Sequence, residues 1–285
     1  MPRAQYRLVF ESFGVLAEVV SDDRGVFDSL PRVLPPGWRP GKGTAGEALV
    51  RFGLARDGRV TLDGAEFFHT DGGASDPLLR LGSVMRHHLA LHAPAHVFIH
   101  AGVVRAGGVT IVIPGSSHSG KTTLVAELVR AGATYYSDEY AVVDSEGLIH
   151  PYAKSLSIRS PGRDHVGVPV PVPEAQIATR AARADLIVVT SYEPGARWRP
   201  RECARSEGAF ALLQNTVAAR PRPGAALAAV SQLSRDARVI SGPRGEAKDM
   251  ANALLSQAPS PGSNGHPQVS DLEPAAAIDP PGPKG

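Results

Sequence analysis

The sequence predicts an α/β fold in which a mixed sheet with flanking helices follows a small β-rich lobe. Short apolar runs of strand length alternate with segments whose apolar residues recur at helical spacing. A glycine- and serine-rich run, Gly115–Thr122, joins the apolar run Val109–Pro114 to one of these helical segments. A strand, a glycine-rich turn and a helix in this order are typical of α/β sheets.

Changes in composition divide the chain into three regions. We expect a small β-rich lobe that ends in a helix over 1–94 and a larger α/β domain over 95–257. Residues 258–285 are dense in Pro, Gly, Ser and Ala, with almost no large apolar side chain. Such a segment buries too little surface to offset its chain entropy, so it is predicted to be disordered.

The first region shows strand, turn and helix signals in succession. Asp63-Gly64 favours the positive φ angles of a tight hairpin turn, and Asp76-Pro77 is a good helix start. We therefore predict strands at Tyr6–Phe10 and Gly14–Val20, a hairpin of Arg59–Leu62 with Ala65–His69, and a helix over Asp76–Ala93.

The second region alternates apolar runs with helical stripes. Gly107-Gly108 predicts a turn, Gly132 a helix C-terminus, and the Pro- and Gly-rich Ser160–Pro173 a loop. The predicted strands are Val97–His100, Val109–Pro114, Tyr135–Asp144, Asp185–Tyr192 and Arg238–Ile240. The predicted helices are Thr122–Ala131, Ser206–Ala218, Gly224–Arg235 and Gly245–Gln257.

Composition narrows the classes of partner and compartment. The 285 residues are 42% hydrophobic and 20% charged, and their net charge of +2 calls for neither nucleic acid nor an anionic membrane. Apolar runs are too short to span a bilayer, and Arg3, Arg7 and Glu11 argue against an N-terminal signal peptide. The one cysteine, Cys203, excludes an internal disulfide and fits a reducing cytoplasm.

Gly115–Thr122 matches the phosphate-binding pattern G-x-x-x-x-G-K-[ST] at every fixed position. Gly115 and Gly120 allow successive N–H groups to face phosphate oxygens, and the following helix adds its positive end. Lys121 would contact the β- and γ-phosphates, and the Thr122 hydroxyl would bind Mg²⁺. The predicted nucleotide contacts are Gly115, Ser116, Ser117, His118, Ser119, Gly120, Lys121, Thr122 and Thr123.

An acidic pair, Asp138-Glu139, follows the predicted loop helix inside the apolar strand Tyr135–Asp144. Two carboxylates in such a strand are awkward unless they serve a function. One would accept the proton of an attacking hydroxyl, and the other would help to hold Mg²⁺. The alternative interpretation of the acidic pair is an edge strand whose carboxylates are solvated. The chain contains no N-K-x-D motif, which GTPases use to recognise the base.

Over Ala95–Gly162 the chain resembles the catalytic domain of bacterial HPr kinase/phosphorylase. The residues that carry the resemblance are Ile99-His100-Ala101-Gly102-Val103, the phosphate-binding loop, and Gly132 followed by Ser137-Asp138-Glu139. The resemblance implies a phosphoenolpyruvate-carboxykinase-like P-loop fold that uses ATP and Mg²⁺. It also implies transfer of the γ-phosphate to a Ser or Thr hydroxyl of a protein or peptide, and assembly into a homo-oligomer.

The resemblance also implies roles for single residues. Asp138 matches the family's catalytic acid, and His100 the histidine that orients it, although a structural strand histidine is the alternative. Lys121 and Arg159 would stabilise the transferring phosphoryl group, and Thr122, Asp138 and Glu139 would hold the metal. Ser157 stands where the family has a metal-binding Glu in its L-E-I-R-G segment, so the resemblance does not extend to the reverse phosphorolysis, which is left open.

Two other functions fit the same residues. A small-molecule kinase would use the same chemistry, with Ser160–Pro173 as a lid over a metabolite. A nucleotide-binding scaffold would bind ATP without transferring phosphate. The loop sequence does not decide between ATP and GTP, because it carries no contacts to the base.

Overall fold

A computed structural model describes residues 5–42, 50–68, 76–115, 119–158 and 168–257 of the chain. It confirms an α/β fold with a mixed sheet and flanking helices. The predicted tail 258–285 lies outside the described residues. No helix in the described segments combines the length and apolar character that a bilayer-spanning segment needs.

One sheet is built from the first part of the chain. Its strand order is β3 (Arg39–Pro40), β1 (Tyr6–Ser12), β2 (Val15–Ser21), β4 (Val50–Leu54), β5 (Val60–Leu62) and β6 (Ala65–Phe68). Only the β2–β4 pair is parallel among these neighbours. The predicted hairpin is confirmed, since Asp63 and Gly64 join β5 to β6 with φ angles of 49° and 82°.

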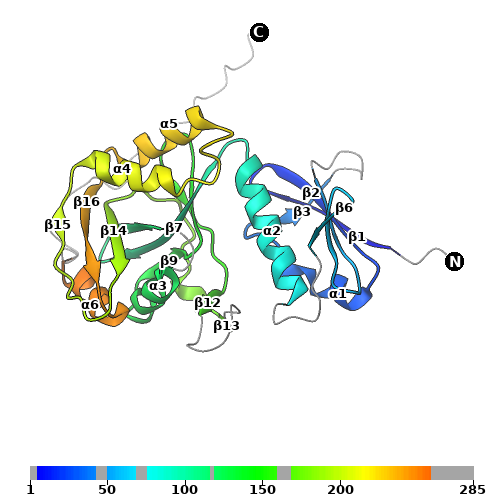
Figure 1. Cartoon of the computed structure of the whole chain (residues 1–285), viewed down its shortest axis with the longest axis horizontal. Helices are drawn as coiled ribbons and strands as arrows, with labels where there is room; N and C mark the ends of the chain where they lie inside the picture. Colours follow the sequence, from blue (N-terminus) through cyan, green and yellow to red (C-terminus); the bar gives the residue numbers. More distant parts are fainter. Residues whose placement is uncertain (1–4, 43–49, 69–75, 116–118, 159–167, 258–285) are drawn as a thin grey trace, which may run out of the picture.

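Short helices and one long helix accompany this sheet. The chain passes from β2 through α1 (Arg24–Ser29) and the 3-10 turn η1 (Leu30–Arg32). The predicted long helix is confirmed as α2 (Pro77–His92), where the Asp76 carboxylate accepts from the Leu78 N–H at 2.9 Å. Leu81, Met85 and Leu89 of α2 are buried against the sheet. Figure 1 shows α2 on the side of this lobe that faces the rest of the molecule.

The second sheet has a parallel centre. Its order is β11 (Ile149–His150), β10 (Tyr140–Val143), β7 (Val97–Ala106), β8 (Val109–Pro114), β14 (Leu186–Tyr192), β16 (Arg238–Arg244) and β15 (Arg201–Glu202). Strand β14 is parallel to both β8 and β16, and the other neighbours are antiparallel. The C-terminal ends of β8, β14 and β16 therefore meet at one edge, where α/β proteins bind ligands.

Helices cover both faces of this sheet. Helices α3 (Lys121–Arg130) and α6 (Ala247–Gln257) lie on one face, and α4 (Arg205–Gln214) and α5 (Pro223–Ser234) on the other (Figure 1). In β8, Ile111 and Ile113 pack with the first pair of helices, while Val112 packs with the second. A strand covered on both faces needs a continuous apolar run, which is why β8 shows no polar alternation.

Two sequence predictions about strands are wrong. The segment Tyr135–Asp144 is not one strand: β9 (Thr134–Ser137) and β10 are separated at Asp138 and Glu139. The Ser137 Oγ accepts from the N–H groups of Glu139 and Tyr140 at 3.1 and 2.9 Å, which turns the backbone there. The other error is the prediction that Ser160–Pro173 is a loop, because β13 (Val168–Val170) lies within it and pairs with β12 (Leu156–Ile158). The 3-10 turn η2 (Glu174–Gln176) follows β13.

Candidate functional site

The phosphate-binding loop leaves the C-terminal end of β8 and enters α3, as the motif requires. Gly120 adopts a φ of 76° directly before the helix, a conformation that favours glycine. A Cβ on Gly115 would lie 2.9 Å from the Ser119 Oγ, a close contact that rotation of the serine side chain would relieve. Ser116, Ser117 and His118 lie outside the described residues.

The Lys121 side chain folds back onto the start of the loop. Its ammonium donates to the Gly115 carbonyl at 2.5 Å and lies 3.4 Å from the Ser119 Oγ. Burial lowers the pKa of Lys121 to about 8, against the opposing charges of Asp138 and Glu139. A desolvated cation in this position would regain favourable interactions if the loop bound an anion such as phosphate.

The central contact of the site joins the loop helix to the acidic pair. The Thr122 hydroxyl donates to the Asp138 Oδ2 at 3.0 Å. The turn after β9 brings the carboxylate to the first turn of α3, and only 4% of Asp138 is exposed. The sequence predicted that both residues would hold metal, and the structure places them in contact.

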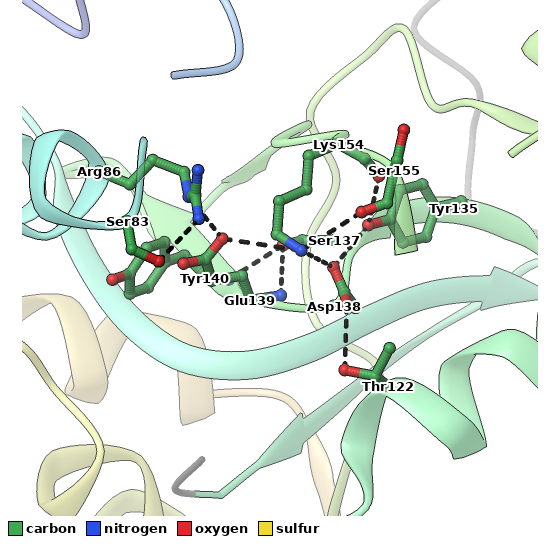
Figure 2. A network of polar contacts seen from close by, with 10 residues as sticks. All are labelled: Ser83, Arg86, Thr122, Tyr135, Ser137, Asp138, Glu139, Tyr140, Lys154 and Ser155. Atoms are coloured by element: carbon green, nitrogen blue, oxygen red, sulfur yellow. Dashed lines mark hydrogen bonds and ion pairs between the residues drawn. The ribbon is translucent and has the colours of Figure 1, made fainter. Parts of the chain in front are cut away.

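Asp138 is also held through its other oxygen (Figure 2). The Tyr135 hydroxyl donates to Oδ1 at 2.9 Å, and the Lys154 ammonium lies 2.9 Å from the same atom. Burial and the Asp138 charge raise the pKa of Tyr135 well above its ordinary value, so this hydroxyl remains a donor. Three donors thus fix the orientation of one buried carboxylate.

Glu139 points away from Thr122 and toward α2 (Figure 2). Its Oε2 accepts from the Arg86 Nε at 2.9 Å and lies 3.8 Å from the Lys154 ammonium. The Arg86 and Glu139 side chains are 15% and 20% exposed. The two adjacent carboxylates therefore have different partners, and the sequence-based assignment of Glu139 to a metal stays a prediction.

His100 lies on β7 opposite Tyr140, the first residue of β10. The two rings are 4.8 Å apart, and the backbone of His100 is bonded to Asn215 and Gly115. Burial lowers the pKa of His100, although Glu139 opposes this shift. The histidine is thus a neighbour of the acidic turn, and its role in orienting Asp138 stays a prediction.

The segment that contains Ser157 is only partly described. Ser157 is exposed on β12, beside the buried Leu156. Arg159, predicted to steady the transferring group, lies outside the described residues.

Sequence reasoning missed the cations that contact the acidic pair. Lys154 follows β11 and Arg86 belongs to α2, so neither lies in or beside a motif. Tyr135 carried a weak signal, since it lies three residues before Asp138 in the same apolar segment. Arg244, the last residue of β16, was also missed, and its guanidinium reaches the phosphate-binding loop.

The donor atoms present fit a magnesium–nucleotide complex. Thr122 and Asp138 supply hard oxygen atoms beside the loop, and Mg²⁺ completes such a set with phosphate oxygens and water. The described residues hold no group of three or more His, Cys, Asp or Glu side chains arranged for a metal. A site that relies on one carboxylate, one hydroxyl and the nucleotide itself does not need such a group.

Comparison with known proteins finds a distant likeness among solved structures. No protein-family profile matches the chain, and no curated protein matches it. Among solved structures, the Hpr(Ser) kinase/phosphatase from Coxiella burnetii is similar over 56% of this chain and 93% of that chain, with 14% sequence identity and a TM-score of 0.32. A likeness of this size carries no argument about activity, so function has to be inferred from the geometry of the site.

Proposed function

We propose that the chain is an ATP-dependent phosphotransferase that moves the γ-phosphate to a hydroxyl group. One observation carries the proposal: the threonine of a P-loop is hydrogen-bonded to a buried carboxylate, with 3.0 Å between Thr122 Oγ1 and Asp138 Oδ2. A buried carboxylate beside the loop is suited to accept the proton of an attacking hydroxyl, and this supports the proposal.

Each residue of the site has a task in this reaction. The loop amides and Lys121 would bind the β- and γ-phosphates, and Thr122 with Asp138 would hold Mg²⁺, which neutralises phosphate charge when bound. Asp138 would accept the proton of the incoming hydroxyl. The hydroxyl oxygen would form a bond to the γ-phosphorus while the bond from the γ-phosphorus to the β–γ bridging oxygen breaks and ADP leaves. Tyr135 and Lys154 would keep that carboxylate oriented.

The proposed acceptor is a Ser or Thr side chain of a protein or peptide. This part of the proposal rests on the resemblance of His100, the loop and the acidic pair to HPr-kinase-type enzymes. ATP as donor and a cytoplasmic setting belong to the same proposal.

A nucleotide-binding protein without transfer activity is the second candidate. It is favoured by the fact that both Asp138 oxygens already have donors: Thr122 on one, Tyr135 and Lys154 on the other. A carboxylate held in this way could serve only to brace the turn that follows β9.

The test is transfer of label from [γ-³²P]ATP to a degenerate Ser/Thr peptide library. We expect the unmodified protein to label peptides and Asp138→Asn to lose about a hundredfold or more of the rate, as for removal of a general base. Asp144→Asn is the matched control, because Asp144 is a hydrogen-bonded carboxylate at the other end of β10. Unchanged labelling by Asp138→Asn would refute its role as base, and ATP binding without any labelling would favour the second candidate.

A further inference from the structure

Arg244 is a buried cation at the edge where the phosphate-binding loop begins. It is the last residue of β16, and only 3% of it is exposed. Glu246 acts on this guanidinium through its charge, but among the described residues no carboxylate forms a salt bridge with Arg244, and its Nε is buried without a hydrogen bond. Burial lowers the pKa of Arg244, and its interactions with Tyr192 and Glu246 offset this shift only in part, so the cost of burying the cation calls for an explanation.

The guanidinium is directed at the back of the loop. Its Nη2 donates to the carbonyl oxygens of Gly120 and Ser119 at 3.1 and 3.3 Å, and its Nη1 to the Gly245 carbonyl at 3.0 Å. A Cβ on Gly120 would lie 2.3 Å from the Nη2. The ring of Tyr192, on the neighbouring strand β14, lies 5.4 Å from the guanidinium carbon.

The bonded carbonyls belong to peptide units whose N–H groups are in the loop. The Ser119 carbonyl shares its peptide unit with the Gly120 N–H, and the Gly120 carbonyl shares its unit with the Lys121 N–H. A cation on the oxygen side polarises the unit and makes its N–H a stronger donor, as in any chain of hydrogen bonds. In a P-loop these are the N–H groups that face phosphate oxygens.

We propose that Arg244 is a positioning residue for the nucleotide phosphates, acting through the Ser119 and Gly120 carbonyls from behind the loop. Its charge is balanced when an anion binds on the opposite side of the same peptide units. The inference rests on the nucleotide binding that the proposed function requires, and it adds a strand residue that no loop motif contains.

The test is the affinity of Arg244→Gln and Arg244→Lys for ATP, ADP and AMP, measured by calorimetry. We expect Arg244→Gln to bind ATP about tenfold more weakly than the unmodified protein does, since a charged hydrogen bond is lost. The loss of affinity should be smaller for ADP and smallest for AMP. Arg244→Lys keeps the charge and should recover most of the ATP affinity. Arg238→Gln is the matched control, because Arg238 is on the same strand, exposed and paired with Glu202.

If Arg244 has only a structural role, the affinities for the three nucleotides should follow a different pattern. Arg244→Gln would then lower the melting temperature without nucleotide and either leave all three affinities unchanged or reduce them by one common factor, and this result overturns the inference. If Arg244→Gln fails to fold, Arg244→Lys decides, since a loss equal for ATP, ADP and AMP overturns the proposal. ATP binding without phosphate transfer refutes the proposed activity alone, whereas no ATP binding by the unmodified protein refutes both.

Discussion

Lys121 carries the most informative charge of the site. Burial lowers its pKa to about 8, so about half of the unbound molecules hold a neutral amine at that pH. Its donation to the Gly115 carbonyl orders the side chain inside the loop before any ligand binds. Phosphate oxygens would stabilise the charged amine, and the pKa of Lys121 should therefore rise on binding.

The affinity for ATP should consequently fall as pH rises above about 8. Above the pKa of the free protein the amine has to take up a proton to bind phosphate, which weakens binding by up to tenfold per pH unit. Calorimetric titrations from pH 7 to pH 10 measure this slope, and buffers of different ionisation enthalpy count the proton. In Lys121→Arg the charge persists throughout, so that variant should show a nearly flat profile. A flat profile for the unmodified protein would contradict the assignment.

The turn between β9 and β10 is the element that makes the site. A continuous strand would send Asp138 and Glu139 to opposite faces of the sheet. In the structure, Ser137 is fully buried and its Oγ accepts from two successive backbone N–H groups. The turn leaves Asp138 facing Thr122 of α3 and Glu139 facing Arg86 of α2.

Ser137→Ala should therefore destabilise the protein by about 1–3 kcal/mol, because two N–H groups lose their acceptor. Chemical denaturation monitored by circular dichroism measures the change. Ser234→Ala is the matched control, since Ser234 is also buried but donates to the Val230 carbonyl within α5. That carbonyl can keep its helical bond, so the control should cost less. Equal costs for both variants would mean that the Ser137 hydroxyl does not hold the turn.

The sequence predicted correctly those turns and helix ends that depend on a few neighbouring residues. The Asp63-Gly64 hairpin, the Asp76 helix start and the strand–loop–helix around Gly120 follow from backbone preferences of a few residues. The break after Ser137 depends on one side chain competing with the ladder of β7, and an apolar run does not reveal such a competition. The pairing of β13 with β12 was missed because Pro and Gly signals dominated that segment.

The cations of the site were beyond sequence reasoning for a different reason. Arg86 is separated from Glu139 along the chain by three strands and the helix α3, and Arg244 reaches Gly120 from a strand more than a hundred residues later. Contacts of this kind depend on how whole elements pack, whereas motif spacing encodes only neighbours along the chain. The loop and its carboxylate were therefore predictable, and the charges that surround them were not.

At the scale of the whole molecule, the two sheets share a hydrophobic cluster. Phe98, Tyr140 and Tyr152 pack with the buried side chains of the first sheet and α2. At the tip of the β1–β2 hairpin, the ring of Phe13 lies 5.4 Å from Phe98 and 5.8 Å from Tyr152. Tyr140 belongs to this cluster and directly follows the acidic turn. Packing between the lobes thus reaches the first residue after the site.

The Arg86–Glu139 pair extends this connection to the charges of the site. Arg86 comes from α2 of the first lobe, and Glu139 from the turn beside Asp138 (Figure 2). Both side chains are mostly shielded from water, at 15% and 20% exposure, so their attraction is weakly screened. Lys154 lies 2.9 Å from Asp138 and 3.8 Å from Glu139, and so links the pair to the carboxylate that contacts Thr122.

A double-mutant cycle on Arg86→Gln and Glu139→Gln should give a coupling energy of about 1–3 kcal/mol in the free energy of unfolding. Arg24 with Asp28 is the matched control, because that pair is 75% and 62% exposed and should couple by less than about 0.5 kcal/mol. If the pair also fixes the acidic turn, Arg86→Gln should slow phosphate transfer more than it weakens ATP binding. A coupling energy no larger than the control's would show that α2 merely lies beside the site, and that the first lobe does not help to position its carboxylates.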